Sequence, residues 1–294
     1  MRFGLTTPVV TLVPHRHAPW EESAGVDALR QVAQTADRLG FHHLTCSDHV
    51  AVPTEVAKVR GARYYDPFST LGFFAAVTGQ IRLVTHVLVL PYYHPLEVAK
   101  RLGTLDRLSG GRVIAGVGVG TLREEFALLG VDFERRGERY EDALRALRAA
   151  LGRREPQYQG THFAFDALIV DPAACQERLP IWLGGRTLRS LHRALRYADG
   201  WDPFGLSVEN LEALVHSAQR LPEWREKKDF ALVFAPEHPI DLSTPEALDG
   251  TVEQLRAYAR LGTTHMNLQF RSQSLPHLLE QLAIFVERVQ PHFA

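Results

Sequence analysis

The stretch SDHV, residues 47–50, places a carboxylate and an imidazole side by side. The pair, Asp48 and His49, comes directly after a short run that predicts a strand. Adjacent strand residues point to opposite faces, so one of the two should line a ligand cavity while the other holds the loop. A histidine in this position can exchange a proton near neutral pH. The alternative interpretation is a solvated Asp–His pair in a surface loop.

A second segment that could contact a ligand is GRVIAGVGVGTLREEF, residues 111–126, with glycines at alternate positions 116, 118 and 120. A dinucleotide-binding fingerprint needs G-x-G-x-x-G, but Thr121 stands where the last glycine belongs, and the segment follows the fourth predicted strand. These glycines would instead let a flat ligand lie against the backbone. The alternative is that they only ease a tight turn.

The clearest signal for an anion is LPIWLGGRTLRSL, residues 179–191. Gly184 and Gly185 leave the backbone bare at the end of a predicted strand. Arg186, Thr187 and the following helix terminus offer a positive charge, a hydroxyl and free N–H groups, which suits a phosphate ester. The alternative is that Thr187 is an ordinary N-cap preceded by turn glycines.

The predicted third strand, in THVLVLPYYHP (residues 85–95), carries one polar residue, His86. A buried histidine usually has a hydrogen-bond partner, so His86 alone indicates no function. Tyr92, Tyr93 and His94 follow in a turn that two prolines fix. These rings could wall a ring-binding slot or cap the barrel.

Two histidines, His15 and His17, have the H-x-H spacing that metal-dependent barrel hydrolases use at their first strand. The rest of such a ligand set is missing, because predicted strands five and six end without histidine and strand eight offers Met266, Asn267 and Gln269. We therefore predict no metal site and place both histidines in a loop. The sequence also lacks the G-x-S-x-G motif and the P-loop lysine motif.

The segments above belong to a regular alternation of short apolar strands and amphipathic helices, which is typical of parallel βα units. Eight such units predict an α/β protein, a (β/α)8 TIM barrel formed by one domain, residues 1–294. Residues 157–170 interrupt the alternation and predict a hairpin insertion. Helices are expected at 26–39, in 66–79, from Pro95 to the SGG turn, beyond Arg135 to Leu151, and at 188–197, 208–218, 245–261 and 275–289.

Composition excludes several other functions. The 294 residues have a formal net charge of -1, which gives no electrostatic footprint for nucleic acid or for a membrane surface. The amino terminus lacks the apolar segment of a secretory signal, and no stretch approaches about 18 uninterrupted apolar residues, so we predict a cytoplasmic protein. Cys46 and Cys175 form no CxxC motif and are expected to be packing residues in a reduced compartment.

Taken in order, GFHHLTCSDHV, LPYYHP, TLDRLSGGR, GVGVGTLREEF and LPIWLGGRTLRSL resemble the bacterial luciferase-like monooxygenase superfamily. The resemblance covers most of the chain. Its compact length and the LPYYHP and GVGVG segments are most similar to the branch that uses the deazaflavin coenzyme F420. Monooxygenases that use FMN share the same barrel.

The resemblance implies a reduced flavin or deazaflavin at the carboxyl-terminal mouth of the barrel, with Asp48 and His49 as the catalytic pair. It implies a phosphate site at the GGRT segment and a non-proline cis bond within the third strand. The cofactor contacts that it implies are His86, Val87, Gly118, Val119, Gly120, Gly184, Gly185, Arg186 and Thr187.

One position departs from the pattern of some relatives. Where F420-dependent sugar-phosphate dehydrogenases carry a catalytic glutamate, this chain has Thr121. A hydroxyl cannot replace a titrating carboxylate, so a sugar phosphate is not expected as the substrate. Glu124 and Glu125, one turn further on, either serve the mouth or interact with a helix dipole.

The function that the resemblance implies is hydride transfer between F420 and a small organic substrate, with His49 as proton donor or orienter. The alternatives are an FMNH2-dependent monooxygenase supplied by a separate reductase, a metal-dependent hydrolase, and a cofactor-binding barrel without catalysis. A lid is expected from residues 52–65, whose basic residues should be solvated, or from 236–241. The resemblance also implies a homodimer.

Overall fold

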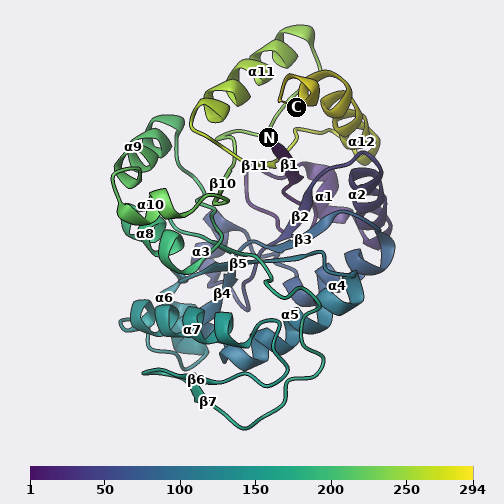
Figure 1. The fold of residues 1–294 in the computed structure, drawn as a ribbon. Helices are drawn as coiled ribbons and strands as arrows, with labels where there is room; N and C mark the ends of the chain where they lie inside the picture. The colour runs from purple at the N-terminus through teal and green to yellow at the C-terminus, as the bar shows by residue number, and fades with distance from the viewer. Residues whose placement is uncertain (294) are drawn as a thin grey trace.

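The computed structural model describes residues 1–293, in which a closed barrel of parallel strands is surrounded by helices (Figure 1). Across these residues the sheet has nine strands in the order β3-β2-β1-β11-β10-β9-β8-β5-β4, and a further pairing of β3 with β5 closes it. β3 and β4 are halves of one barrel strand, so eight strands surround the axis. The predicted (β/α)8 fold is confirmed.

The strands are short, and their neighbours pair in parallel, so their carboxyl ends all lie on the same rim of the barrel. The barrel strands are β1 (Arg2–Leu5), β2 (His43–Cys46), β3 (Arg82–Thr85), β4 (Leu88–Val89), β5 (Val113–Gly118), β8 (Ile181–Leu183), β9 (Gly200–Trp201), β10 (Ala231–Phe234) and β11 (His265–Leu268). The predicted insertion is an antiparallel hairpin of β6 (Tyr158–Gln159) and β7 (Ala164–Phe165), as expected.

The long helices lie outside the barrel, and most begin at a residue that caps them. Side chains of Asp66, Thr187 and Ser207 accept a hydrogen bond from the backbone N–H three residues later. The long helices are α2 (Val26–Arg38), α4 (Pro67–Val77), α5 (Pro95–Ser109), α7 (Arg136–Ala150), α8 (Leu188–Tyr197), α9 (Val208–Ala218), α11 (Pro245–Arg260) and α12 (Leu275–Ile284).

Short helices lie in several of the connections, for which the sequence analysis gave no helix bounds. They are α1 (Pro19–Ser23), α3 (Thr54–Arg60), α6 (Arg123–Leu128) and α10 (Pro222–Glu226), together with the 3-10 turn η1 (Leu90–Tyr92). The predicted helix 275–289 is also interrupted, because α12 ends at Ile284 and continues as the π turn η2 (Phe285–Val289) before the 3-10 turn η3 (Gln290–Phe293).

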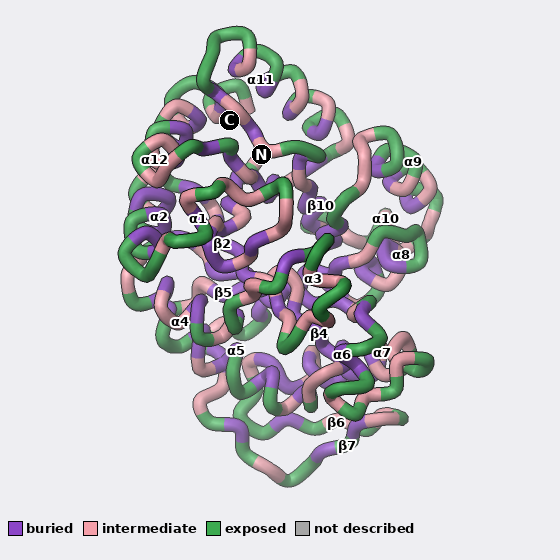
Figure 2. Tube along the Cα trace, turned by 180° about the vertical axis from the view of Figure 1, so that it is seen from behind, coloured by how far each residue is buried: buried purple, intermediate pink, exposed green. Residues whose placement is uncertain are grey.

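Apolar side chains fill two separate regions. The larger core lies between the sheet and the surrounding helices, and strands β2, β5 and β10 are buried along their whole length (purple in Figure 2). The smaller cluster comprises Val84, Ile114, Trp182, Ala231 and Val233, which come from the four barrel strands β3, β5, β8 and β10. The barrel is therefore packed rather than open.

The TLDRLSGGR segment, residues 104–112, holds the end of the barrel opposite the rim. The buried Asp106 carboxylate accepts hydrogen bonds from the backbone N–H groups of Cys175 and Gln176, both at 2.9 Å. The Arg112 guanidinium donates to the carbonyl oxygens of Ala75, Ile81 and Ser109. This segment, among the most recognisable in the sequence, therefore stabilises the fold.

The two cysteines differ from each other. Cys46 is buried, and burial raises the pKa of its thiol to about 12, which fits the expected packing role. Cys175 is exposed at Asp106, so the expectation that it is a packing residue is wrong.

Within residues 1–293, no helix combines the length and the apolar character needed to cross a membrane.

Candidate active site

Three strand ends meet around the side chain of Val87. The peptide bond between His86 and Val87 is cis, as the resemblance implied, and it separates β3 from β4, so His86 lies between the strands rather than inside one. A Cβ atom on Gly118 would lie 2.5 Å from Cγ2 of Val87, and one on Gly184 would lie 3.1 Å from its Cγ1. Glycine leaves room for Val87 at both positions. The ends of β4, β5 and β8 therefore lie together on the rim.

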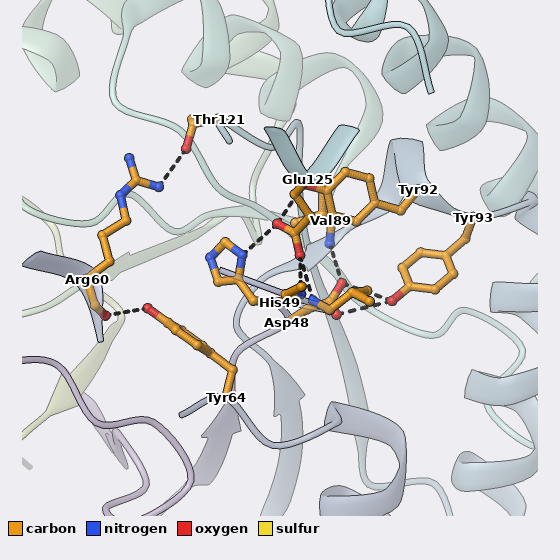
Figure 3. Close-up of polar contacts among 11 residues, drawn as sticks. Asp48, His49, Arg60, Tyr64, Val89, Tyr92, Tyr93, Thr121 and Glu125 are labelled. Carbon is orange, nitrogen blue, oxygen red and sulfur yellow. Dashed lines mark hydrogen bonds and ion pairs between the residues drawn. The ribbon is translucent and has the colours of Figure 1, made fainter. Parts of the chain in front are cut away.

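Asp48 joins the end of β2 to the end of β4. It is 5% exposed, and its carboxylate accepts hydrogen bonds from the backbone N–H of Val89 at 3.0 Å and from the phenol of Tyr93 at 3.1 Å (Figure 3). Burial raises the pKa of Asp48 to about 6 even though both hydrogen bonds favour the charged form. Asp48 is thus the member of the pair that holds the loop.

His49 contacts a residue whose role the sequence left open, Glu125 of α6 (Figure 3). Nδ1 of His49 lies 2.8 Å from Oε2 of Glu125, and the phenol of Tyr92 donates to the same oxygen at 2.9 Å. Oε1 of Glu125 accepts from the backbone N–H groups of Val50 and Ala51. With 1% exposure, Glu125 ties the segment after β2 to the rim after β5.

The charge state of Glu125 determines which nitrogen of His49 carries a hydrogen. Burial opposes ionisation of Glu125, but hydrogen bonds from His49, Tyr92 and Val50, with the charge of His49, hold its pKa below the usual value. The ionised carboxylate can only accept, so Nδ1 of His49 is the donor. Among residues 1–293, Nε2 of His49 has no hydrogen-bond partner, so it is available to a ligand.

The connection between β2 and α4 covers this pair. The ring of Tyr64 meets that of His49 edge-on, with ring centroids 4.5 Å apart. The Tyr64 phenol donates to the carbonyl of Arg60 at 2.8 Å, and the Arg60 guanidinium donates to the Thr121 hydroxyl at 3.2 Å (Figure 3). In Figure 2 the exposed helix α3 lies next to β4. One of the two segments expected to form a lid therefore lies over His49.

The basic residues of this connection are not equally solvated. Lys58 is exposed and pairs with Glu55. Arg63, however, donates to the carbonyl oxygens of Glu21 and Glu22 at 3.0 and 2.7 Å. The expectation of a solvated basic segment is therefore wrong for Arg63, which fastens the connection to α1.

A buried polar cluster lies behind the cis bond. Asp202, which follows β9, is fully buried, and its Oδ1 accepts from Nδ2 of Asn267 at 3.0 Å. Nε2 of His86 lies 3.3 Å from the same oxygen. Burial lowers the pKa of His86, but the charge and hydrogen bond of Asp202 more than offset this and raise it. Within residues 1–293, Oδ2 of Asp202 has no partner.

Sequence reasoning missed Glu125 as a definite site residue, and it missed Asp202 altogether. Glu125 follows an exposed glutamate and precedes the fully buried Phe126, so the polarity change in EEF was the available signal for it. Asp202 stands in the predicted sixth strand segment, ADGWDPF, where an acid after a buried tryptophan was the signal.

The GGRT segment has the geometry of a capped helix terminus. The Thr187 hydroxyl accepts from the backbone N–H of Ser190 at 3.2 Å, which confirms the N-cap interpretation. Gly185 has a φ of 128°, and a Cβ atom there would lie 2.6 Å from Cβ of Ser190. The Arg186 guanidinium lies 5.3 Å from the centre of the Phe204 ring. A phosphate role for these residues stays a prediction.

The remaining glycine of the GVGVG segment is required by its turn. Gly120 has a φ of 76°, and a Cβ atom there would lie 2.6 Å from Cγ1 of Val89 and 2.7 Å from Cε2 of Phe126. Val119, beside it, is partly buried against the core. Both residues belong to the rim, and contact with a cofactor stays a prediction for them.

His15 and His17 lie in the connection after β1, as the sequence analysis expected. Nε2 of His17 lies 3.0 Å from Oε1 of Glu22, and its Nδ1 lies 2.7 Å from the carbonyl of Val13. Nowhere in residues 1–293 do three or more His, Cys, Asp or Glu side chains form a group that could hold a metal ion.

The chain is similar in sequence to several known proteins. The chain matches the family model for luciferase-like monooxygenases over residues 7–274. It is 28% identical over 279 residues to an uncharacterized protein of Mycobacterium tuberculosis, covering 88% of this chain and 93% of that protein. It is 27% identical over 197 residues to the FMNH(2)-dependent dimethylsulfone monooxygenase of Pseudomonas fluorescens, covering 65% of this chain and 51% of that enzyme.

Two solved structures share the fold over the full chain. The monooxygenase RslO1 from Streptomyces bottropensis is 21% identical with a TM-score of 0.78, and 100% of both chains is covered. The coenzyme F420-dependent tetrahydromethanopterin reductase of Methanopyrus kandleri is 16% identical with a TM-score of 0.71, covering 100% of this chain and 99% of that one. Because the family model spans most of its length, this chain belongs to the luciferase-like monooxygenase family.

Proposed function

We propose that this protein catalyses hydride transfer between coenzyme F420 and a small organic substrate. The observation that carries the proposal is the His49–Glu125 pair, which leaves one imidazole nitrogen without a partner among residues 1–293, on the rim where four strand ends meet. Interconversion of an alcohol and a carbonyl moves a proton together with the hydride, and a positioned imidazole can move that proton. F420, when bound, would supply or accept the hydride.

The rim has features that fit a phosphorylated, ring-bearing cofactor. Gly184 and Gly185 expose backbone before the first turn of α8, and Arg186 adds a positive charge. Val87 offers an apolar side chain between two glycines. Oδ2 of Asp202 is a buried acceptor with no partner within residues 1–293. A hydrogen-bond donor on the bound cofactor would satisfy it.

Each residue of the rim has a task in this proposal. Nε2 of His49 exchanges the proton with substrate, and Glu125 holds the other ring nitrogen protonated. Asp48 keeps the ends of β2 and β4 in register through the N–H of Val89. Tyr64 and α3 exclude water from the imidazole.

The test is a pair of titrations of the purified protein, one with F420 and one with FMN, followed by quenching of cofactor fluorescence. Saturable binding of F420, together with substrate-dependent loss or gain of the oxidised deazaflavin absorbance, supports the proposal. Saturable binding of neither cofactor contradicts it and favours a barrel without catalysis.

A second candidate is an FMNH2-dependent monooxygenase supplied by a separate reductase. It is favoured by the likeness to dimethylsulfone monooxygenase, whose name states that cofactor. Binding of reduced FMN but not of F420, with oxygen consumed only when a flavin reductase is added, would replace the first candidate by this one. Under either candidate function, we predict that the protein is a homodimer and lies in the cytoplasm.

A further inference from the structure

A cavity of about 280 Å³ opens on the same rim, and its lining includes neither the His49–Glu125 pair nor the GGRT segment. Its walls come from the segments that follow β1, β10 and β11, which are neighbours in the sheet. The lining residues are His15, Arg16, His17, Ala18, Glu237, His238, Pro239, Phe270, Arg271 and Ser272.

The cavity carries more positive than negative charge. Arg16 and Arg271 are exposed, and neither guanidinium forms an ion pair or a hydrogen bond with another side chain of residues 1–293. The acidic residue of the lining is Glu237. Asp241 lies close enough to Arg271 for the guanidinium to help lower the pKa of that carboxyl, after the larger effect of the Ser243 hydroxyl.

The histidines of the lining add to this charge when they are protonated. The hydrogen bond to Glu22 is the main cause that raises the pKa of His17, so its positive charge is partly balanced by that carboxylate. His15 has a φ of 64°, which is uncommon for a residue with a side chain. This conformation places His15, Arg16 and His17 together in one turn of the wall.

The position of the cavity separates it from the predicted phosphate site of the cofactor. Around the barrel the strands run β8, β9, β10, β11, β1 and β2, so the GGRT segment after β8 lies on the far side of β9 from the cavity. His49 follows β2, which pairs directly with β1. A volume of 280 Å³ is near the lower end of small-ligand pockets and is suited to part of a small molecule.

We propose that this cavity binds the acidic group of the substrate, with Arg16 and Arg271 as its anion ligands. Guanidinium groups form charge-assisted, often bidentate hydrogen bonds with carboxylates and phosphates. The substrate class is therefore a small organic acid or phosphate ester, whose remaining part extends along the rim toward His49. This inference rests on the proposed function for the identity of the substrate, but the anion site itself can be tested alone.

The experiment is isothermal titration calorimetry of the cofactor-free protein with two probes, inorganic phosphate and succinate. Saturable binding of either probe, weakened at least about tenfold in both Arg16→Gln and Arg271→Gln, supports the proposal, and the tighter probe identifies the acid group. Arg256→Gln is the matched control, because Arg256 is an exposed arginine of α11 that pairs with Glu253 away from the cavity.

Two results would overturn the inference. One is the absence of saturable binding for both probes, and the other is equal affinity in the cavity variants and in Arg256→Gln. Thermal unfolding of each variant checks that it is folded. F420 titration of the wild-type protein separates the two proposals, since normal F420 binding without saturable binding of either anion probe removes this inference and leaves the proposed function standing.

Discussion

The proton transfer proposed for His49 depends on a carboxylate that is far away in the sequence. Glu125 lies 76 residues further along, and its ionised form requires the hydrogen on Nδ1 of the imidazole. A histidine held in one tautomer by a buried carboxylate is a recurring arrangement in acid–base catalysis. In the proposed function, Nε2 is then the atom that meets the substrate.

Replacement of His49 by alanine should slow turnover by about 10²- to 10⁴-fold, because the positioned proton carrier is lost. The dissociation constant for the cofactor should change much less. Steady-state kinetics and fluorescence titration measure the two quantities separately. His216→Ala, an exposed histidine of α9, is the control. Equal turnover in His49→Ala and the control would remove His49 from the mechanism.

The neighbouring glutamates give a matched pair of variants. Glu125→Gln turns an acceptor into a group that can present an N–H to Nδ1 of His49, so we expect about a 10²-fold lower turnover and a changed pH profile. Glu124→Gln changes an exposed residue of the same helix and should be close to wild type. The role of Glu125 would be rejected if both variants kept the same turnover and pH profile.

Asp48 should give stability an unusual pH dependence. Its pKa is about 6 in the folded protein against an ordinary 3.8, so between these pH values the folded state keeps a proton that the unfolded state releases. The Asp48 contribution to the free energy of unfolding therefore falls as pH rises from about 4 to about 6, by roughly 3 kcal/mol in total. Urea unfolding of wild type and Asp48→Asn at pH 4.5 and 6.5 measures this. An identical pH dependence in both proteins would contradict it.

The rim elements are held together by the fit of Val87 between β5 and β8. Gly118→Ala would put a methyl group 2.5 Å from Cγ2 of Val87, and we expect it to lower the free energy of unfolding by about 1–3 kcal/mol. In Gly118→Ala with Val87→Ala, the loss should be smaller than the sum of the two single losses. Denaturant unfolding measures all three variants, and simple additivity would show that the two side chains do not meet.

Elements with strong local signals were predictable, and elements defined by tertiary contacts were not. The bounds of α8 and α9 match the expected ranges because Thr187 and Ser207 cap them. The short helices α3 and α6 span too few residues to show a helical period. Their absence from the prediction also hid the roles of Arg60 and Glu125.

The candidate site was also predictable only in part. Parallel strands place their carboxyl ends on one rim, so the meeting of Asp48, Val87 and Gly184 could be expected from the fold. The partners of these residues could not, because the contacts of Glu125 and Asp202 depend on how distant connections pack. Two of the glycines that were assigned to cofactor binding are also required by the packing of the protein itself, since Gly118 and Gly184 make room for Val87.

The barrel residues His43 and His265 form a cluster with His42, which precedes β2, and all three histidines should stay neutral. Burial lowers the pKa of His42 to about 2, of His265 to about 3 and of His43 to about 4, and mutual repulsion adds to this for His42 and His265. The ring centroids of His42 and His265 are 4.7 Å apart. Protonation of any one of them therefore opposes folding.

The protein should for this reason lose stability in mild acid. A histidine kept neutral in the folded state and protonated in the unfolded state contributes stability that is lost as pH falls below about 6.5, at about 1.4 kcal/mol per pH unit. His265→Gln should reduce the slope of the free energy of unfolding against pH by about that amount between pH 6 and 4. His216→Gln, on the surface, should leave the slope unchanged, and equal slopes in the two variants would contradict the buried neutral state.

The central claim is that the ends of β2, β4, β5 and β8 form a single binding site for a redox ring. A crystal structure of the protein grown with F420 tests it most directly. We predict that the ring lies against the His86–Val87 bond with His49 within hydrogen-bonding distance, and that the phosphate meets the segment from Gly184 to Thr187. A well-occupied F420 molecule bound elsewhere on the protein, with this rim empty, would contradict the account.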